Sequence, residues 1–208
     1  MTFDLLGDAM PSVAQSLHHT AYTSTYNAAP SRSERHAASH RDMPGGEPMI
    51  ERNDEPKYPI DAISMLKADH RTVNDLFTQY ESAGDCSTKH LIAEQVFTEL
   101  DLHAQLEENV FYPAYETQTG KNGTQLVADS RLEHEQAREL MLEMQGLDLA
   151  EEEFEAKFHE LMHTVRHHIA AEENEMFPEA EQILADQLED LMDEMVELKH
   201  RLMTAPQQ

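Results

Sequence analysis

The stretch HAQLEENVFYP, residues 103–113, recurs further along the chain as HIAAEENEMFP, residues 168–178. Both copies read His-x3-Glu-Glu-Asn-x2-aromatic-Pro, and both lie in segments whose apolar residues recur at helical spacing. Residues four apart lie on one face of a helix, so the histidine and the first glutamate of each copy share a face. The repeat therefore predicts two long helices that present the same pair of polar side chains.

The segments that precede the two copies of the repeat also resemble each other. LKADHRTVNDLF, residues 66–77, and SRLEHEQARELM, residues 130–141, each place a histidine, His70 or His134, within an apolar helical period. This first histidine precedes the histidine of the repeat by 33 residues in one half and by 34 in the other. The sequence therefore predicts two similar helix pairs related by approximate two-fold symmetry.

Helical apolar periods cover most of the chain after Pro59. Polar connections that contain glycine separate them at residues 84–85 and 119–123. Short connections make sequential helices antiparallel, so we predict an all-α fold, an up-down-up-down four-helix bundle with an additional C-terminal helix. The expected helices cover residues 61–83, 86–117, 124–145, 149–180 and 183–202. The last of them carries on one face Leu184, Leu188, Leu191, Met195, Leu198 and Leu202.

Residues 1–57 differ in composition from the rest of the chain. They hold five of the nine prolines, many Ser and Ala residues, some Asn, and no sustained apolar period. Such a segment cannot bury enough apolar surface to offset the entropy lost on ordering. We therefore expect a disordered, low-complexity N-terminal tail over residues 1–57 and a helical bundle over residues 58–205. The spacing of the four histidines in the tail matches no ordered metal site.

The formal net charge is −26, and residues 1–57, with five bases and eight acids, contribute only −3 of it. An acidic surface repels nucleic acid and anionic lipid, so neither is expected as a partner. No apolar run is long enough to span a bilayer, and no secretory signal is evident. Cys86 is the single cysteine, which excludes an internal disulfide and favours a reducing compartment. The cytoplasm is the expected location.

Polar side chains interrupt the apolar stripes at positions that should face the core. A buried carboxylate is costly unless it is paired or bound to a metal, so such residues on four helices require a common cause. A lone histidine on an apolar face is more often a satisfied core residue, but the repeat argues against that interpretation. We therefore predict a metal centre. Its expected ligands are His70, His103, Glu107, His134, His168 and Glu172.

Neighbouring polar and aromatic residues are assigned to other places. Glu108 and Glu173, the second acids of the repeat, are expected at the solvated surface. His167 is turned by about 100° from His168 and is assigned to the rim of the site. The aromatic residues and prolines that end each copy are expected to shape a helix end or a kink. Tyr112 or Tyr115 could approach the centre, but neither is counted among the ligands.

The chemistry of this residue set indicates two metal ions rather than one. Two glutamates from separate helices can each bridge a pair of metals, and four imidazoles can cap the pair at its ends. Imidazole and carboxylate ligands suit iron, whereas sulfur-free ligation with oxygen bridges is less natural for structural zinc. A di-iron centre inside the bundle is therefore expected.

The ordered set of motifs resembles the hemerythrin-like family, also called the HHE cation-binding domain, over about residues 60–180. The resemblance rests on DHR at residues 69–71, EHE at residues 133–135 and the two His-x3-Glu-Glu copies. It implies an up-down-up-down bundle that holds two iron ions with an oxo or hydroxo bridge. By the same resemblance, the four histidines would be terminal ligands, and Glu107 and Glu172 would bridge the irons.

Two positions depart from the oxygen carriers of that family. The carriers have a fifth histidine one turn after the third, and Arg138 stands there in this chain. Their last carboxylate is an aspartate five residues after its histidine, whereas Glu172 follows His168 by four. The resemblance therefore leaves one metal short of a protein ligand, which argues against simple reversible oxygen carriage.

We expect a cytoplasmic, non-haem di-iron protein that binds or senses dioxygen. A redox enzyme that consumes peroxide or nitric oxide at the same centre is the first alternative, and an iron donor or iron-homeostasis protein is the second. A metal-free interaction bundle is a further alternative, which the buried carboxylates argue against. The expected partner is dioxygen or another small diatomic or peroxide ligand, and the chain is expected to be a monomer or a homodimer.

Overall fold

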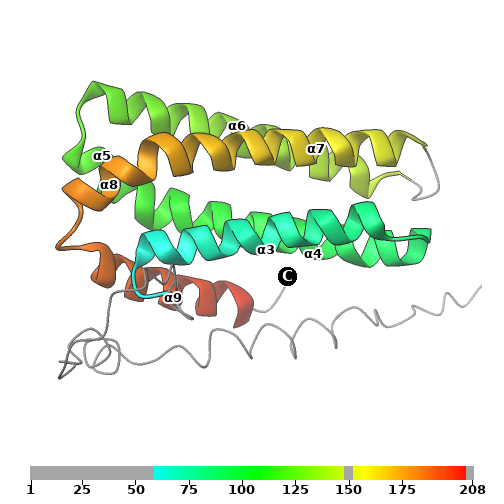
Figure 1. The fold of residues 1–208 in the computed structure, drawn as a ribbon, viewed down its shortest axis with the longest axis horizontal. Coiled ribbons are helices and arrows are strands. Elements are labelled where there is room, and N and C mark those ends of the chain that lie inside the picture. Colours follow the sequence, from blue (N-terminus) through cyan, green and yellow to red (C-terminus); the bar gives the residue numbers. More distant parts are fainter. Residues whose placement is uncertain (1–58, 148–151, 205–208) are drawn as a thin grey trace, which may run out of the picture. The chain divides into compact units, whose positions relative to one another are not determined.

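The computed structural model describes residues 59–147 and 152–204, and every regular element in these ranges is helical. Four long helices lie side by side, as Figure 1 shows. Two of them continue through a short π-helical turn into a shorter helix. The elements are α3 (Ala62–Ser82), α4 (Cys86–Leu106), η1 (Glu107–Phe111), α5 (Tyr112–Gln118), α6 (Lys121–Gln145), α7 (Glu152–Ala171), η2 (Glu172–Met176), α8 (Phe177–Ile183) and α9 (Leu188–Thr204).

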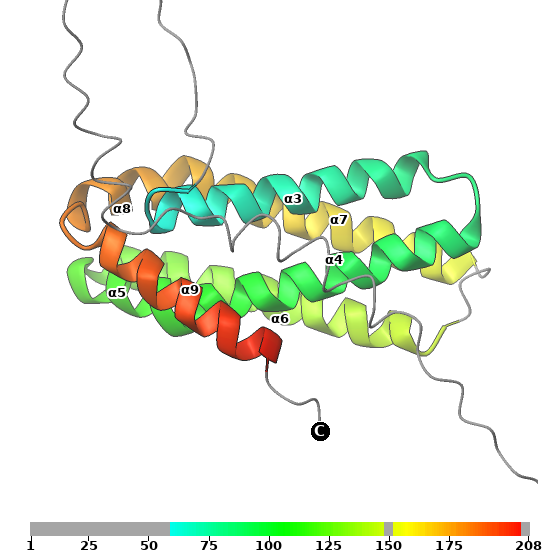
Figure 2. The same ribbon diagram turned by 90° about the horizontal axis from the view of Figure 1, so that it is seen from below.

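The arrangement of the four long helices confirms the predicted bundle. α3 packs beside α4 and α6 packs beside α7, so the two helix pairs predicted from the repeat lie together. α9 crosses α3 and α4 on their outer side, which confirms the additional C-terminal helix (Figure 2). The predicted tail over residues 1–57 lies outside the described residues. In the part of the chain that the structure describes, no helix is long and apolar enough to cross a bilayer.

Acidic residues begin the first two helices. Asp61 Oδ1 accepts from the Ser64 backbone N–H at 2.7 Å, and Ser64 Oγ accepts from the Asp61 N–H at 3.0 Å. Asp85 Oδ1 accepts from the Thr88 N–H at 2.9 Å. Each cap satisfies N–H groups that the first helical turn leaves unbonded, and so stabilises the start of its helix. Both starting points agree with those predicted from the sequence.

The predicted apolar stripes form a dry core toward the end of the bundle opposite α5 and α8. Phe77, Tyr80 and Phe158 are each at most 1% exposed, and the Tyr80 and Phe158 rings stack with 3.8 Å between centroids. Complete burial of a large apolar side chain contributes roughly 1.5–3 kcal/mol. This core fixes the spacing of α3, α4, α6 and α7, and with it the positions of the polar residues that these helices carry.

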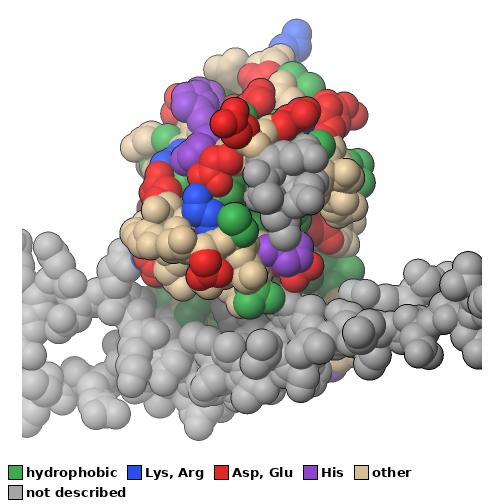
Figure 3. Space-filling model, turned by 90° about the vertical axis from the view of Figure 1, so that its right-hand side faces the viewer, with side chains coloured by type: hydrophobic (Ala, Val, Ile, Leu, Met, Phe, Trp, Pro, Cys, Tyr) green, Lys and Arg blue, Asp and Glu red, His purple; other side chains and the backbone are tan. Residues whose placement is uncertain are grey.

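The surface of the bundle is acidic. On the end of the bundle that Figure 3 shows, Asp and Glu side chains outnumber those of Lys and Arg. This agrees with the formal net charge of −26 for the whole chain. Such a surface repels other polyanions.

α6 begins earlier than the sequence predicts. The predicted loop covered residues 119–123, but the helix starts at Lys121 and includes Gly123. A side chain at Gly123 would collide with the side chain of Thr119, so this glycine permits a close approach rather than a turn. The same glycine had indicated a loop in the sequence, and that prediction was wrong.

The C-terminal helix begins later than predicted. The chain turns at residues 184–187, where Leu184 is fully buried, and α9 starts at Leu188 rather than at residue 183. Leu198 and Leu202, predicted on the inward face, are only half-buried. Lys199 is buried instead, at 4% exposure. A charged residue therefore occupies the innermost position near the C-terminal end of this helix.

Both copies of the repeat form a π-helical turn between the predicted ligand glutamate and the proline. In η1, the Tyr112 N–H bonds to the carbonyl of Glu107, five residues back. Pro113 has no N–H, and in a regular α-helix its ring would clash with the carbonyl four residues earlier, which the wider turn avoids. η2 repeats this geometry from Glu172 to Phe177. The predicted kink is thus a wide turn, and the aromatic residue that follows each turn is fully buried.

Candidate metal centre

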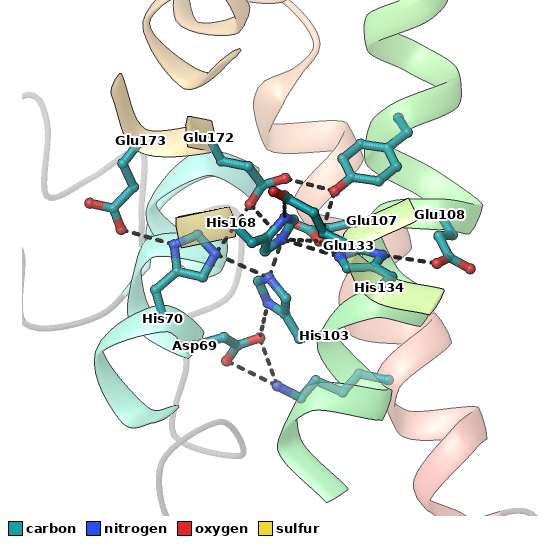
Figure 4. A network of polar contacts seen from close by, with 12 residues as sticks. Asp69, His70, His103, Glu107, Glu108, Glu133, His134, His168, Glu172 and Glu173 are labelled. Atoms are coloured by element: carbon teal, nitrogen blue, oxygen red, sulfur yellow. Dashed lines mark hydrogen bonds and ion pairs between the residues drawn. The ribbon is translucent and has the colours of Figure 1, made fainter. Parts of the chain in front are cut away.

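Six polar side chains meet inside the bundle, where the four long helices approach the π-helical turns (Figure 4). Each comes from a different element, and none is more than 7% exposed. They are the six residues predicted from the sequence, so the structure brings the whole set together. In chain order they are His70, His103, Glu107, His134, His168 and Glu172.

The histidines form two pairs whose members face each other through Nε2. His70 Nε2 lies 3.1 Å from His103 Nε2, and His134 Nε2 lies 3.1 Å from His168 Nε2. Each pair joins neighbouring helices, α3 with α4 and α6 with α7. Two nitrogens bound at a right angle to one metal, each about 2.1 Å from it, would be about 3.0 Å apart. Each pair is therefore spaced to bind one metal ion.

The two glutamates lie between the histidine pairs. Glu107 Oε1 is 3.1 Å from His103 Nε2, and the other oxygen, Oε2, is 3.2 Å from His134 Nε2. Glu172 Oε2 lies 3.3 Å from the Nε2 atom of one histidine in each pair. Each carboxylate therefore reaches both pairs, which is what a ligand that bridges two metals requires.

Three buried polar atoms have no hydrogen-bond partner among the described residues: His103 Nδ1, Glu107 Oε1 and Glu172 Oε2. A buried carboxylate oxygen without a donor is costly, and two such oxygens occur in one cluster. Cations at the centre would supply the missing partner of each oxygen. Nitrogen and oxygen ligands without sulfur suit iron. In each of two groups the candidate ligand atoms lie within 4.8 Å of one another, so the residues fit two cations.

Two half-buried glutamates orient one histidine in each pair. Glu173 Oε1 accepts from His70 Nδ1 at 2.9 Å, and Glu108 Oε1 accepts from His134 Nδ1 at 2.9 Å. A proton on Nδ1 leaves the lone pair of Nε2 free to face a metal. Both glutamates were predicted at the solvated surface; they are half-exposed, and the sequence did not predict their bonds to the histidines. Each is the second glutamate of its copy of the repeat, which is the signal that could have identified it.

The acid before the first histidine of each pair faces the second histidine of that pair. Glu133 Oε2 accepts from His168 Nδ1 at 3.2 Å, and Glu133 Oε1 accepts from His167 Nδ1 at 2.7 Å. His167 is exposed, which confirms its predicted place at the rim. Asp69 holds the matching place in the other half, with Oδ2 3.8 Å from His103 Nδ1. The two-fold relation therefore extends to the residues around the cluster.

Tyr112 brings a hydroxyl group into the centre, although the sequence placed it outside the ligand set. Its Oη lies 2.7 Å from Glu172 Oε1 and 3.2 Å from Glu107 Oε2, so its proton can bond to either carboxylate. Burial, together with these two negative charges, raises the pKa of Tyr112 well above its usual value. Its ring stacks on a histidine of the centre, as the ring of Phe177 does in the other half. At this position the two halves therefore differ by one hydroxyl group.

The facing charges shift the pKa values of the cluster. Burial disfavours the charged form of His168, but the carboxylates of Glu172 and Glu107 opposite it raise its pKa to about 10. Burial also disfavours ionisation of Glu107, yet His103 beside it holds the pKa of Glu107 well below its usual value. The carboxylate is therefore ionised, with protonated imidazole as its counter-ion. Metal ions must displace such protons in order to bind.

A cavity of about 30 Å³ lies beside the histidine layer. Arg138 lines it, with Nη2 2.7 Å from Glu108 Oε1. A space of this size holds roughly one or two small molecules. The cavity therefore places room for a small ligand next to both histidine pairs. Its walls combine the four histidines with apolar side chains that include Val73, Leu100, Ala137, Met141 and Val165.

Comparison with known proteins assigns the domain. A family model described as the hemerythrin HHE cation-binding domain matches residues 61–180, more than half of the chain, and this range contains all six convergent residues. The chain belongs to this family. The resemblance predicted from the sequence is thereby confirmed. The matched range ends before α9, so this helix lies outside the hemerythrin match.

Two curated proteins are similar over the hemerythrin domain. An uncharacterized hemerythrin-like protein of Schizosaccharomyces pombe is 29% identical over 119 residues, which cover 57% of this chain and 59% of that protein. A protein named DNA nickase, from Nostoc sp., is 26% identical over 121 residues, which cover 58% of this chain and 34% of that protein. The alignments thus span little more than half of the first relative and about a third of the second.

A solved structure shares the fold. It is a crystal structure of a hemerythrin HHE cation-binding domain-containing protein from Mycobacterium kansasii, with a TM-score of 0.60 and 22% sequence identity. The comparison covers 72% of this chain and 96% of that chain. At this identity the likeness establishes the fold, in agreement with the family match.

Proposed function

We propose that this hemerythrin-family chain is a non-haem protein that holds two iron ions and binds or senses dioxygen. The observation that carries the proposal is the presence of two histidine pairs, each 3.1 Å across, with two carboxylates between them. Imidazole and carboxylate ligands suit iron. When bound, a pair of ferrous ions would supply an open coordination position and two electrons, which is the chemistry that dioxygen binding needs.

The chain's own residues favour a neutral, small ligand. Val73, Met141 and Val165 line the cavity beside the histidines and offer little hydrogen bonding to water. Transfer of a charged or strongly hydrated molecule into an apolar space is costly, whereas a neutral diatomic molecule loses little hydration there. The lining and size of the cavity therefore support dioxygen as the ligand.

A redox enzyme that acts on peroxide or nitric oxide is the second candidate. The Tyr112 hydroxyl lies 2.7 Å from Glu172 Oε1 and offers a proton beside the centre. Arg138 stands where the oxygen carriers of the family have a histidine, and it brings a positive charge to the cavity wall. A proton donor and a cation assist an anionic or proton-consuming substrate, so both features support turnover rather than reversible binding.

The similarity to a DNA nickase does not extend the proposal to DNA. The aligned residues cover 34% of that protein. The net charge of −26 opposes contact with a polyanion, because binding to DNA depends on positive charge. A small redox-active ligand, rather than nucleic acid, is therefore the partner that we propose.

Anaerobic loading with ferrous iron, followed by addition of oxygen, tests the proposal. We expect about two irons per chain, and an optical spectrum of paired iron after oxygen is added. A stable adduct that is lost when oxygen is removed supports binding, whereas rapid bleaching with continued oxygen consumption supports the enzyme. An iron content of one or zero per chain would contradict both candidates.

A further inference from the structure

One charged residue of α9 reaches the surroundings of the metal centre. Lys199 is 4% exposed, and its Nζ donates to both carboxylate oxygens of Asp69 on α3, at 3.0 Å and 3.1 Å. α9 lies across α3 and α4 (Figure 2), beyond the residues 61–180 that the family model covers. The contact therefore joins the hemerythrin domain to a helix that its family match does not include.

Asp69 stands between Lys199 and a histidine of the centre (Figure 4). Its Oδ2 is 3.8 Å from His103 Nδ1, which is too long for a hydrogen bond. His103 Nδ1 is buried and has no hydrogen-bond partner among residues 59–147 and 152–204. The other three histidines each donate through Nδ1 to a glutamate, at 2.9, 2.9 and 3.2 Å. His103 thus differs from the other three in lacking a carboxylate bonded to its outer nitrogen.

Glu133 is the two-fold counterpart of Asp69. It accepts directly from His168 Nδ1 at 3.2 Å, and its other oxygen accepts from the exposed ring of His167. In the half that carries Asp69, a buried ammonium group bonds to both carboxylate oxygens instead. The acid at this position therefore bonds to a histidine of the centre in one half and to a lysine of α9 in the other.

This difference has a chemical consequence for metal binding. A carboxylate bonded to the outer nitrogen of an imidazole makes the ring a stronger ligand, and loss of such a partner typically costs about 10- to 100-fold in metal affinity. Lys199 Nζ donates to both oxygens of the Asp69 carboxylate, which lies too far from His103 Nδ1 for a hydrogen bond. The position beside His70 and His103 therefore has a weaker set of donors than the position beside the other histidine pair.

We propose that Lys199 is a positioning residue through which α9 makes the two metal positions unequal, the weaker being beside His70 and His103. The inference rests on the proposed two-metal centre. It gives α9 a part in the metal chemistry, because the difference exists only while the helix is docked. Movement of α9 away from α3 would release Asp69 toward His103 and strengthen the weaker position.

Titration of the full chain with cobalt(II), with each binding step resolved, tests the inference. The unaltered chain should bind two ions in two separated steps. In Lys199→Met, the released Asp69 carboxylate can accept from His103 Nδ1, so the weaker step should tighten about 10-fold or more while the stronger step stays unchanged. The cobalt-loaded variant should also show one additional slowly exchanging imidazole N–H signal in its NMR spectrum, because His103 gains a hydrogen bond.

Further variants separate the buried lysine from surface charge. Glu197→Gln removes a charge at an exposed position of α9 and leaves the helix docked, so it should leave both affinities unchanged. Asp69→Asn should alter the weaker step little, because this carboxylate is not bonded to His103. Glu133→Gln should weaken the stronger step about 10-fold or more, because its carboxylate is bonded to a histidine of the centre. If Lys199→Met does not fold, the contrast between Asp69→Asn and Glu133→Gln tests the proposed inequality of the two metal positions.

Two results would overturn the role of Lys199: a Lys199→Met variant that binds cobalt as the unaltered chain does, or the same tightening in Glu197→Gln. Equal effects of Asp69→Asn and Glu133→Gln would overturn it as well. If the unaltered chain takes up two ions, the proposed centre stands even when the inference fails. If the unaltered chain takes up fewer than two, both proposals fail.

Discussion

Three of the four histidines of the centre have a separate partner for each ring nitrogen. Nε2 faces the other members of the cluster, while Nδ1 of His70, His134 and His168 donates to an acid outside it. An acid on Nδ1 determines which nitrogen carries the proton and which presents a lone pair. The centre therefore depends on these outer acids as well as on the six convergent residues.

Replacement of one outer acid measures its contribution. Glu108→Gln removes the carboxylate that accepts from His134 Nδ1, and a neutral amide is a weaker acceptor. We expect the affinity for iron(II) at one position to fall about 10- to 100-fold, as measured by competition with a coloured chelator. Glu135→Gln, at an exposed position of α6, is the matched control. An equal loss in the control would show that surface charge alone sets the affinity.

Glu107→Gln tests the bridge between the histidine pairs. Glu107 reaches one histidine of each pair through separate oxygens, at 3.1 Å and 3.2 Å. An amide offers one oxygen and no charge, so we expect the iron content to fall from about two per chain to half of that or less. Iron analysis and optical spectroscopy of the loaded protein check this. Persistence of the paired-iron bands would show that Glu107 is not a bridge.

At the residue scale, the sequence identifies side chains whose chemistry conflicts with their position. His70 and Glu107 interrupt apolar stripes, so a buried polar cluster could be predicted from them. Glu108 and Glu173 occupy half-exposed positions, where an acid conflicts with nothing. Their roles depend on which imidazole lies opposite, and the packing of a different helix determines that.

At the scale of elements, the π-helical turns join the centre to the helix ends. η1 and η2 each begin at one of the glutamates that lie between the histidine pairs. A π-helical turn holds one extra residue, so it offsets every side chain that follows and brings Tyr112 and Phe177 inward. Pro113 and Pro178 predict a kink in the sequence, but apolar periodicity cannot distinguish a bend from an inserted residue. For this reason the sequence could not decide between Tyr112 and Tyr115 as the tyrosine that reaches the centre.

A polar contact at the other end of the bundle joins three helices. Glu155 of α7 accepts from Tyr80 Oη of α3 at 3.1 Å and from Lys89 Nζ of α4 at 2.6 Å. The bond from Lys89 lowers the pKa of Glu155 below its usual value of 4.5. Its stabilising effect is therefore present above pH 4.5 and is lost as the pH falls through the lowered value of the folded chain.

We expect Glu155→Gln to lower the unfolding free energy of the metal-free chain by about 1 kcal/mol near pH 7, and by much less near pH 3. Urea unfolding at both pH values measures the two differences. Glu160→Gln, exposed on the same helix, is the matched control. A difference that does not shrink toward acid pH would show that the contact is not ionic.

At the scale of the whole molecule, the bundle consists of two similar helix pairs, and a few side chains make the two halves unequal. The symmetric part follows from the repeat, which is why the bundle and the six convergent residues could be predicted. The Tyr112 hydroxyl and Arg138 each belong to one half alone, and Lys199 of α9 contacts one half alone. Lys199 lies in no repeat and is 130 residues from Asp69, so no pattern in the sequence predicts their contact.

The balance between protons and metals gives a prediction for the whole bundle. Facing carboxylates raise the pKa of His168 from 6.5 to about 10 in the folded chain. The folded chain holds a proton that the unfolded chain releases, so this stabilisation is complete below pH 6.5 and is lost as the pH rises toward 10. We expect the urea midpoint of the metal-free chain to fall between about pH 7 and about pH 9. Metal ions replace these protons, so the urea midpoint of the metal-loaded chain should fall less over the same pH range. Equal falls in the two forms would show that metal ions and protons do not compete for the centre.

The two-metal centre is tested most directly by X-ray diffraction from iron-loaded crystals, with data collected on both sides of the iron absorption edge. We predict two anomalous peaks about 3–4 Å apart, both in contact with the two buried glutamates. One peak should lie beside His70 and His103, and the other beside His134 and His168. A single peak, or peaks away from these side chains, would contradict the centre described.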